Sequence, residues 1–158
     1  MDELRSSRTS ARRAEGREAP AASPPAVMLT GVGKRYDIVS CFSALTRVVA
    51  VDPNPLAPAQ YVAQMRATAP RIDDPAYVPA LQELCERHGV GAVLPLTDLD
   101  IEALALARER GQLPALVPSS QVARATYDKY EAHQLLVAHS LPSPPTVLPD
   151  GDLDALDY

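Results

Sequence analysis

Residues 26–45 read AVMLT, GVGKRY and then DIVSCFSAL, which is a short apolar run, a glycine-containing turn and an amphipathic stretch. A continuous apolar run of this length is typical of a strand that is buried on both faces of a sheet. Ile38, Phe42 and Leu45 then recur at the spacing of one helical face. The stretch therefore predicts a strand, a tight turn at Gly31 and Gly33, and a helix.

The same alternation of strand and helix continues along the chain. Further strands are expected at RVVAVD (47–52), GAVLPL (91–96) and PALVPS (114–119), with a weaker candidate at RATAPRI (66–72). Helices are expected between and after them, at 73–89, 97–111, 119–127 and 128–140. Alternating elements of this kind form βαβ units with right-handed crossovers. The sequence thus predicts an α/β fold: a Rossmann-like, three-layer domain with a mostly parallel sheet of about five strands.

Composition divides the chain into three parts and limits its function. Residues 1–25 are rich in Arg, Ser, Ala, Glu and Pro and are expected to form a disordered tail. Residues 26–127 would form the α/β domain, and 128–158 a C-terminal helix and linker. The formal net charge of −5 argues against a nucleic-acid partner. No apolar stretch reaches the roughly 18 residues of a membrane helix, so a cytoplasmic protein is expected.

The two cysteines, Cys41 and Cys85, lie far apart with no neighbouring histidine cluster, and we interpret both as buried thiols. No Ser-His-Asp set is legible in the sequence. We therefore expect neither a catalytic residue nor a metal ligand in this chain.

Polar residues gather where the expected strands end. Gly31, Gly33 and Lys34 follow the first strand, Asp52 and Asn54 end the second, and Thr97 and Asp98 follow the strand at 91–96. Because ligands of parallel α/β sheets bind at the carboxyl ends of strands, these seven residues form the predicted substrate site. Thr97, with Asp100 three residues later, is better explained as part of a helix capping box.

The glycine turn has two interpretations that the residues leave open. Gly31 and Gly33 could turn backbone N–H groups toward a bound anion, or could simply permit a tight turn. They match two glycines of a dinucleotide fingerprint, and Asp52 lies about twenty residues on, where such enzymes hold the ribose. Tyr36 stands where the third glycine belongs, which opposes that interpretation. A Walker loop is excluded, since Met28 and Arg35 occupy required positions.

Several segments together resemble a known family. TGVGKRYD, VDPNPLAPAQY, the stretch from APRIDDPAY to TDLDIEALA, and the stretch from VPSSQVARATYDKY to LPSPPTV are similar to the N-terminal half of ATP-grasp carboxylate-amine ligases of the carbamoyl-phosphate-synthase-like type. The similarity covers roughly residues 27–147. It implies a pre-ATP-grasp domain that carries part of the acceptor-substrate site, for a carboxylate or an amine, and needs no dinucleotide.

The resemblance also implies how the complete enzyme works. Such a ligase uses ATP and Mg²⁺ and joins a carboxylate to an amine through an acyl phosphate. Lys129, the cation of the Asp-Lys pair that opens the last helix, would reach the ATP. In the family, the phosphate-binding lysine and the acidic magnesium ligands follow the segment where this sequence reads DGDLDALDY.

We therefore expect the chain to be inactive alone and to work with an ATP-grasp domain in cis or in trans. Two alternatives remain: a dinucleotide-binding module of an oxidoreductase, and a non-catalytic interaction domain that could form a homo-oligomer.

Overall fold

The computed structural model describes residues 24–148. Most of the predicted tail (1–25) and the last part of the predicted linker (149–158) lie outside the described residues. The described elements follow one another along the chain in the order β1 (Ala26–Thr30), α1 (Tyr36–Leu45), β2 (Val48–Val51), η1 (Pro58–Val62), β3 (Met65–Ala67), α2 (Tyr77–His88), β4 (Val90–Pro95), η2 (Asp98–Asp100), α3 (Ile101–Glu109), α4 (Ser120–Tyr127) and α5 (Lys129–Ala138).

The four strands form one parallel sheet in the order β3-β2-β1-β4. The predicted α/β class is confirmed, with one strand fewer than expected. The missing strand is the segment 114–119, which makes only an isolated parallel bridge between Ala115 and Val93. Two backbone hydrogen bonds hold it beside β4, from Val93 N to Pro114 O and from Leu116 N to Val93 O. Pro114 and Pro118 lack the N–H groups that a longer ladder needs.

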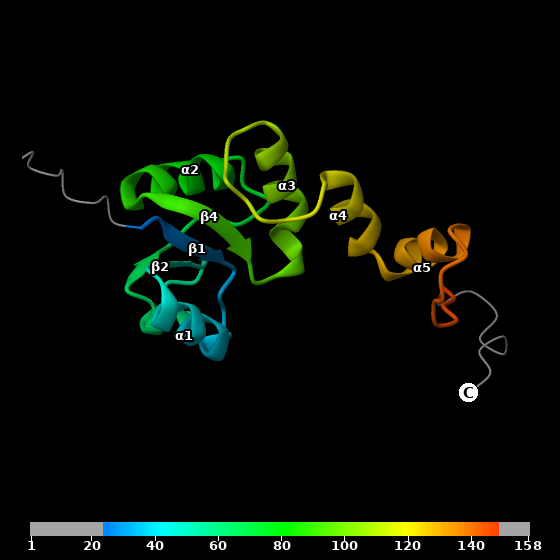
Figure 1. Ribbon diagram of the computed structural model, residues 1–158, viewed down its shortest axis with the longest axis horizontal. Helices are drawn as coiled ribbons and strands as arrows, with labels where there is room; N and C mark the ends of the chain where they lie inside the picture. The colour runs from blue at the N-terminus through cyan, green and yellow to red at the C-terminus, as the bar shows by residue number, and fades with distance from the viewer. Residues whose placement is uncertain (1–23, 149–158) are drawn as a thin grey trace, which may run out of the picture.

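Helices cover both faces of the sheet, as Figure 1 shows, with α1 on one side and α2 and α3 on the other. Alternate strand residues point to opposite faces, so each face has its own apolar cluster. Leu29, Val48 and Ala50 pack with Val39 of α1. Met28 and Val49 pack with the buried leucines of α2 and α3. The predicted three-layer arrangement therefore follows from short strands that are apolar on both faces.

Two helix ends follow predicted signals, and a third departs from the usual one. Gly89 ends α2 in the left-handed region, with φ 61°. Asp128 caps α5, accepting hydrogen bonds from the backbone N–H groups of Tyr130 and Glu131. Ser140, which follows α5 where glycine is usual, has φ 55° and is the one described non-glycine residue with a positive φ. The helix-exit conformation is thus kept without the residue that adopts it most easily.

The prediction of two buried thiols is wrong for Cys41 and holds only in part for Cys85. Cys41 is exposed on α1, and Cys85 is partly buried in α2. Desolvation of the Cys85 thiol, followed by the charge of Glu86, raises its pKa to about 11. Within residues 24–148, no helix is long and apolar enough to cross a membrane.

Candidate functional site

The sheet changes winding direction beside β1, and a pocket lies at that point. The chain moves from β1 outward through β2 to β3, and then crosses back to place β4 on the other side of β1. In open parallel sheets, ligands bind at the carboxyl ends of the strands where the winding reverses. A pocket of about 480 Å³ lies at these strand ends. Its wall includes Gly31 after β1, Asp52 after β2, and Thr97 after β4.

The loop between β3 and α2 forms the other wall of the pocket. Ala69, Pro70 and Ile72 supply apolar surface there, and Arg71 and Asp73 supply charge. Arg71 and Asp73 form an exposed ion pair at 3.3 Å, which water screens strongly. The pocket therefore has a wall of loop residues whose charges are largely matched to each other.

Asp52 is engaged by the backbone around it. One carboxylate oxygen accepts a hydrogen bond from Gly33 N at 2.7 Å, and the other accepts one from Asn54 N at 2.9 Å. The side chain is buried, at 8% exposure. Both oxygens therefore accept hydrogen bonds from the loops that follow β1 and β2. The Gly33 N–H points at an internal carboxylate and not at a bound phosphate. This arrangement favours the structural interpretation of the glycine turn.

Gly31 and Gly33 both adopt positive φ, at 59° and 47°. At Gly31 the space is also limited, because an added Cβ would collide with the side chain of Thr97. The turn is thus fixed by backbone conformation and by close approach of the β4 loop.

The seven predicted substrate residues separate into three groups. Gly31, Asp52 and Thr97 line the pocket. Gly33 is not a lining residue, but its N–H donates a hydrogen bond to Asp52. Lys34, Asn54 and Asp98 are exposed and lie outside the pocket wall. The side chain of Asn54 accepts a hydrogen bond from Leu56 N, which shapes the loop after β2.

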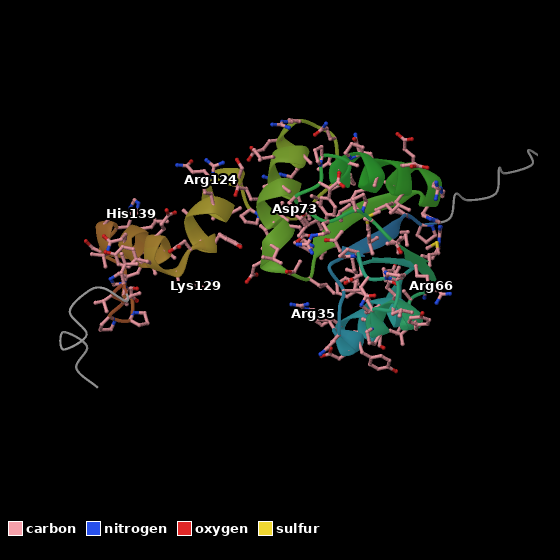
Figure 2. All side chains as sticks on the ribbon, turned by 180° about the vertical axis from the view of Figure 1, so that it is seen from behind. Arg35, Arg66, Asp73, Arg124, Lys129 and His139 are labelled. Carbon is pink, nitrogen blue, oxygen red and sulfur yellow. The ribbon has the colours of Figure 1, made fainter. Side chains whose placement is uncertain are left out.

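Arg35 is the pocket residue that the sequence interpretation passed over in favour of Lys34. It lines the pocket, is exposed, and forms no ion pair among residues 24–148. Its Nη1 lies 3.4 Å from the carbonyl oxygen of Gly31, a long hydrogen bond. Figure 2 shows Arg35 near the strand ends, whereas Arg66 lies on another part of the domain. A free guanidinium beside an apolar pocket suits a carboxylate or a phosphate.

A buried polar cluster forms part of the pocket wall, and the sequence interpretation missed it. Asp100 is fully buried, and its Oδ2 accepts hydrogen bonds from Thr30 Oγ1 at 2.6 Å and from Tyr77 Oη at 2.8 Å. Desolvation by burial raises the pKa of Asp100, although both hydrogen bonds act to lower it. Desolvation, and then the charge of Asp100, raises the pKa of Tyr77. Asp100 and Tyr77 both line the pocket.

The capping-box interpretation of Thr97 and Asp100 holds for only one member. Thr97 Oγ1 accepts a long hydrogen bond of 3.4 Å from Leu99 N, so Thr97 does cap the short helix η2. Asp100 makes no capping hydrogen bond and points inward to Thr30 and Tyr77. The sequence could not distinguish a capping role of Asp100 from a buried one, because an acid three residues after Thr97 fits a helix cap as well as a buried hydrogen-bond network.

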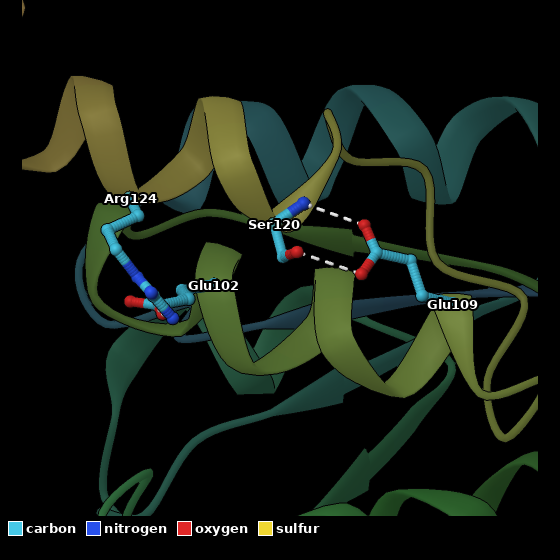
Figure 3. A network of polar contacts seen from close by, with 4 residues as sticks. All are labelled: Glu102, Glu109, Ser120 and Arg124. Atoms are coloured by element: carbon cyan, nitrogen blue, oxygen red, sulfur yellow. Dashed lines mark hydrogen bonds and ion pairs between the residues drawn. The ribbon is translucent and has the colours of Figure 1, made fainter.

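Lys129 lies away from this pocket. Figure 2 shows it on the extension formed by α4 and α5, and it is exposed at the start of α5. The extension is attached through polar contacts between α3 and α4, which Figure 3 shows. Glu109 accepts hydrogen bonds from the Ser120 N–H and hydroxyl, both at 2.8 Å, and Arg124 pairs with Glu102 at 2.6 Å. The structure therefore does not bring Lys129 together with the strand-end residues.

One family model matches the sequence, and no curated protein does. The model described as "PylC-like, N-terminal domain" matches residues 27–114, which include all of the sheet except Ala26 and all of the pocket-lining residues. The match ends before α4, so it does not include Lys129.

Solved structures share the fold at low sequence identity. N5-carboxyaminoimidazole ribonucleotide synthetase from Thermotoga maritima aligns over 84% of this chain and 35% of its own, with TM-score 0.60 and 19% identity. L-amino acid ligase from Bacillus licheniformis aligns over 77% of this chain and 30% of its own, with TM-score 0.60 and 14% identity. The biotin carboxylase domain of a single-chain bacterial carboxylase aligns over 77% of this chain and 30% of its own, with TM-score 0.56 and 21% identity. This chain spans about a third of the length of these structures.

Proposed function

Because the chain belongs to the family of PylC-like N-terminal domains, we propose that it is the substrate-side domain of an ATP-dependent carboxylate-amine ligase. The complete enzyme would activate a carboxylate as an acyl phosphate, which an amine then attacks to form a carbon–nitrogen bond. The role of this chain in that enzyme would be to bind and orient a small carboxylate or amine substrate. A cytoplasmic location goes with this proposal.

One observation carries the proposal: the pocket lies at the winding reversal and combines apolar walls with one cation that forms no ion pair within residues 24–148. Arg35 is that cation. The acidic residues of the pocket wall are already bound to other protein groups or buried. A small ligand with a carboxylate or acyl phosphate would meet a guanidinium in a partly dry site, where a charge-assisted hydrogen bond is strong. Three of the predicted residues, Gly31, Asp52 and Thr97, would contact or frame that ligand.

We expect ATP and Mg²⁺ to bind outside this pocket. Residues 24–148 hold no group of three or more His, Cys, Asp or Glu side chains that could bind a metal ion. Phosphoryl transfer depends on positioned cations and metal, and the pocket offers one free arginine. We therefore assign ATP and Mg²⁺ to a separate ATP-grasp domain, in cis or in trans. Lys129, exposed on the α4–α5 extension, is proposed to meet the nucleotide there.

Nucleotide turnover tests the division of labour. The purified chain mixed with ATP, Mg²⁺ and a panel of small carboxylates and amines is expected to form no ADP above the protein-free rate. ADP formation by this chain alone, abolished by Arg35→Gln, would contradict the assignment of ATP to a separate domain. Arg66→Gln is the matched control, since Arg66 stacks on Tyr61 at 4.6 Å and lies outside the pocket wall.

The dinucleotide alternative loses its main support in the structure. Asp52 would have to hold a ribose, but both of its oxygens accept backbone hydrogen bonds. Tyr36 stands at the start of α1, where the fingerprint requires glycine. NADH fluorescence that changes on addition of the chain at micromolar concentration would restore this alternative.

An interaction role is compatible with the ligase proposal and has its own observation. Apolar side chains are exposed along the extension, among them Val122, Tyr127, Leu135, Val137 and Leu141. No residue of α5 is buried. This surface is where the proposed ATP-grasp domain, or a second copy of the chain, would pack. Size-exclusion chromatography with light scattering tests it, and a monomer whose elution is unchanged in Leu135→Ser would count against self-association.

A further inference from the structure

Asp100 has one carboxylate oxygen in use and one without a partner. Oδ2 accepts both hydrogen bonds of the cluster, from Thr30 and Tyr77. Oδ1 is buried, and no group within residues 24–148 hydrogen-bonds to it. The residue lines the pocket while its side chain is 0% exposed. A buried acceptor without a partner destabilises the folded protein, and more so when it is charged, so its presence at a pocket wall requires a reason.

The position of the carboxylate is fixed from three elements. Thr30 ends β1, Tyr77 begins α2, and Asp100 joins η2 to α3. Their hydrogen bonds of 2.6 Å and 2.8 Å meet at the same oxygen, so the carboxyl group has one preferred orientation. A helix cap does not explain the residue, because Asp100 makes no capping hydrogen bond to α3. Neither does an ion pair, since no cation of residues 24–148 bridges to it.

We propose that Asp100 determines the substrate specificity of the pocket by accepting a hydrogen bond at Oδ1 from an amine nitrogen of the bound small molecule. Thr30 and Tyr77 are the positioning residues that hold the carboxylate for this contact. The inference rests on the proposed function, because it concerns the ligand of the same pocket.

An amine fits the site better than a hydroxyl group does. A carboxylate that is already anchored at Oδ2 offers only acceptor capacity at Oδ1, and an ammonium group supplies both the donor and the compensating charge. A buried carboxylate is stabilised by a cation in contact with it far more than by a neutral donor. Arg35 lines the same pocket with the opposite charge. A ligand with an amine at one end and an anionic group at the other would satisfy both residues.

Two matched probes test the contact with Asp100. β-Alanine carries a carboxylate and an amine, and propionate is the same carboxylate without the amine. Each is titrated into the full chain while the backbone amide signals of Gly31 and Thr97 are followed by NMR. β-Alanine is expected to bind at least about tenfold more tightly than propionate, which is the effect of one charge-assisted hydrogen bond. In Asp100→Asn the two probes are expected to bind equally, because the carboxylate charge is lost.

Two further variants separate specificity from a general loss of structure. Tyr77→Phe removes one anchor and is expected to reduce the β-alanine preference while propionate binding is kept. Glu109 lies on α3 outside the pocket wall, so the variant Glu109→Gln is expected to keep the full preference for β-alanine over propionate. The Cγ signal of Asp100 in isotope-labelled protein gives a second readout, since a bound amine holds the carboxylate ionised to lower pH.

The outcomes distinguish this inference from the proposed function. Equal binding of the two probes to the parent chain, at the pocket amides, would overturn the role of Asp100 and leave a carboxylate-binding pocket. A β-alanine preference that survives unchanged in Asp100→Asn would overturn it as well. Failure of both probes to shift any pocket amide at tens of millimolar would overturn the proposed function and the inference together.

Discussion

The carboxylate of Asp52 binds the backbone N–H of Gly33 at 2.7 Å and so joins the ends of β1 and β2. The glycine turn that suggests a phosphate site in the sequence is thus closed by a side chain of the protein itself. The same carboxylate also receives the N–H of Asn54, which starts the loop after β2. We therefore place the proposed ligand site in the pocket that Gly31, Arg35 and Asp100 line, and not at the Gly33 N–H.

Asp52→Ala should destabilise the protein strongly. It leaves two backbone N–H groups without an acceptor, and each is expected to cost about 1–3 kcal/mol in the free energy of unfolding. Urea unfolding followed by circular dichroism measures the change. Asp98→Ala is the control, because Asp98 is exposed, and its effect should stay within about 0.5 kcal/mol. Equal stabilities of the two variants would show that the Asp52 contacts do not hold the turn.

Gly31→Ala should be more destabilising than Gly111→Ala. Both glycines have positive φ, at 59° and 69°, so both variants carry the strain of roughly 1–2 kcal/mol that a Cβ meets there. The added Cβ at Gly31 also collides with Thr97, whereas at Gly111 nothing lies within 4 Å. The difference in unfolding free energy between the variants measures the close approach of the two loops. Combining Gly31→Ala with Thr97→Ser should remove part of that difference, since Ser lacks Cγ2.

Asp100→Asn should stabilise the folded chain at neutral pH. Burial raises the folded-state pKa of Asp100 above its ordinary value of 3.8. The side chain therefore favours folding most below that value, and this contribution is lost as the pH rises through the raised pKa. Asn keeps an acceptor for Thr30 and Tyr77 and has no charge to bury. Urea unfolding at several pH values should show that the advantage of the variant is greatest at neutral pH and shrinks toward pH 4.

A constant difference across that pH range would contradict the raised pKa of Asp100. A loss of stability at neutral pH would indicate that the cluster needs the charged carboxylate even without a ligand. That result would separate the stability of the cluster from its proposed role in binding.

The attachment of α4 to α3 should loosen in acid through Glu109. Hydrogen bonds from the Ser120 N–H and hydroxyl lower the pKa of Glu109 below its ordinary value of 4.5. Its contribution is therefore present above that value and is lost as the pH falls through the lowered pKa. The protection factors of the α4 amides, which are corrected for intrinsic exchange at each pH, should fall as the pH drops below 4.5, and Glu109→Gln should lower them already at neutral pH. Glu86→Gln, on the exposed face of α2, should leave those protection factors unchanged.

The fold was predictable because its signals are local and agree with one another. Val48 to Val51 form a continuous apolar run, and Gly89 ends a helix of the right length, so the order of elements followed from sequence alone. The fifth strand was predicted and is absent as a strand, because prolines on both sides of Ala115 limit its pairing with β4. Family membership was also predicted correctly, from segments spread over roughly residues 27–147, and the family model matches residues 27–114.

The site was predictable only in its location. Gly31, Asp52 and Thr97 lie close together because the carboxyl ends of parallel strands meet at one edge of the sheet. Arg35 lines the pocket and Lys34 does not. This difference depends on how the turn ends and α1 begins, which the sequence pattern does not specify. The link between Thr30 and Asp100 spans 70 residues, and nothing local distinguishes it from a helix cap. Long-range polar contacts of this kind leave no periodic signal in a single sequence.

The most direct test of the central claim is to titrate the full chain separately with propionate and with NADH while following the backbone amide signals. The ligase-domain proposal predicts that propionate shifts Gly31 and Thr97, that Arg35→Gln abolishes the shifts while Arg66→Gln keeps them, and that NADH has no effect. Saturable NADH shifts at Gly31 and Gly33, with no response to propionate, would contradict it and restore a dinucleotide site.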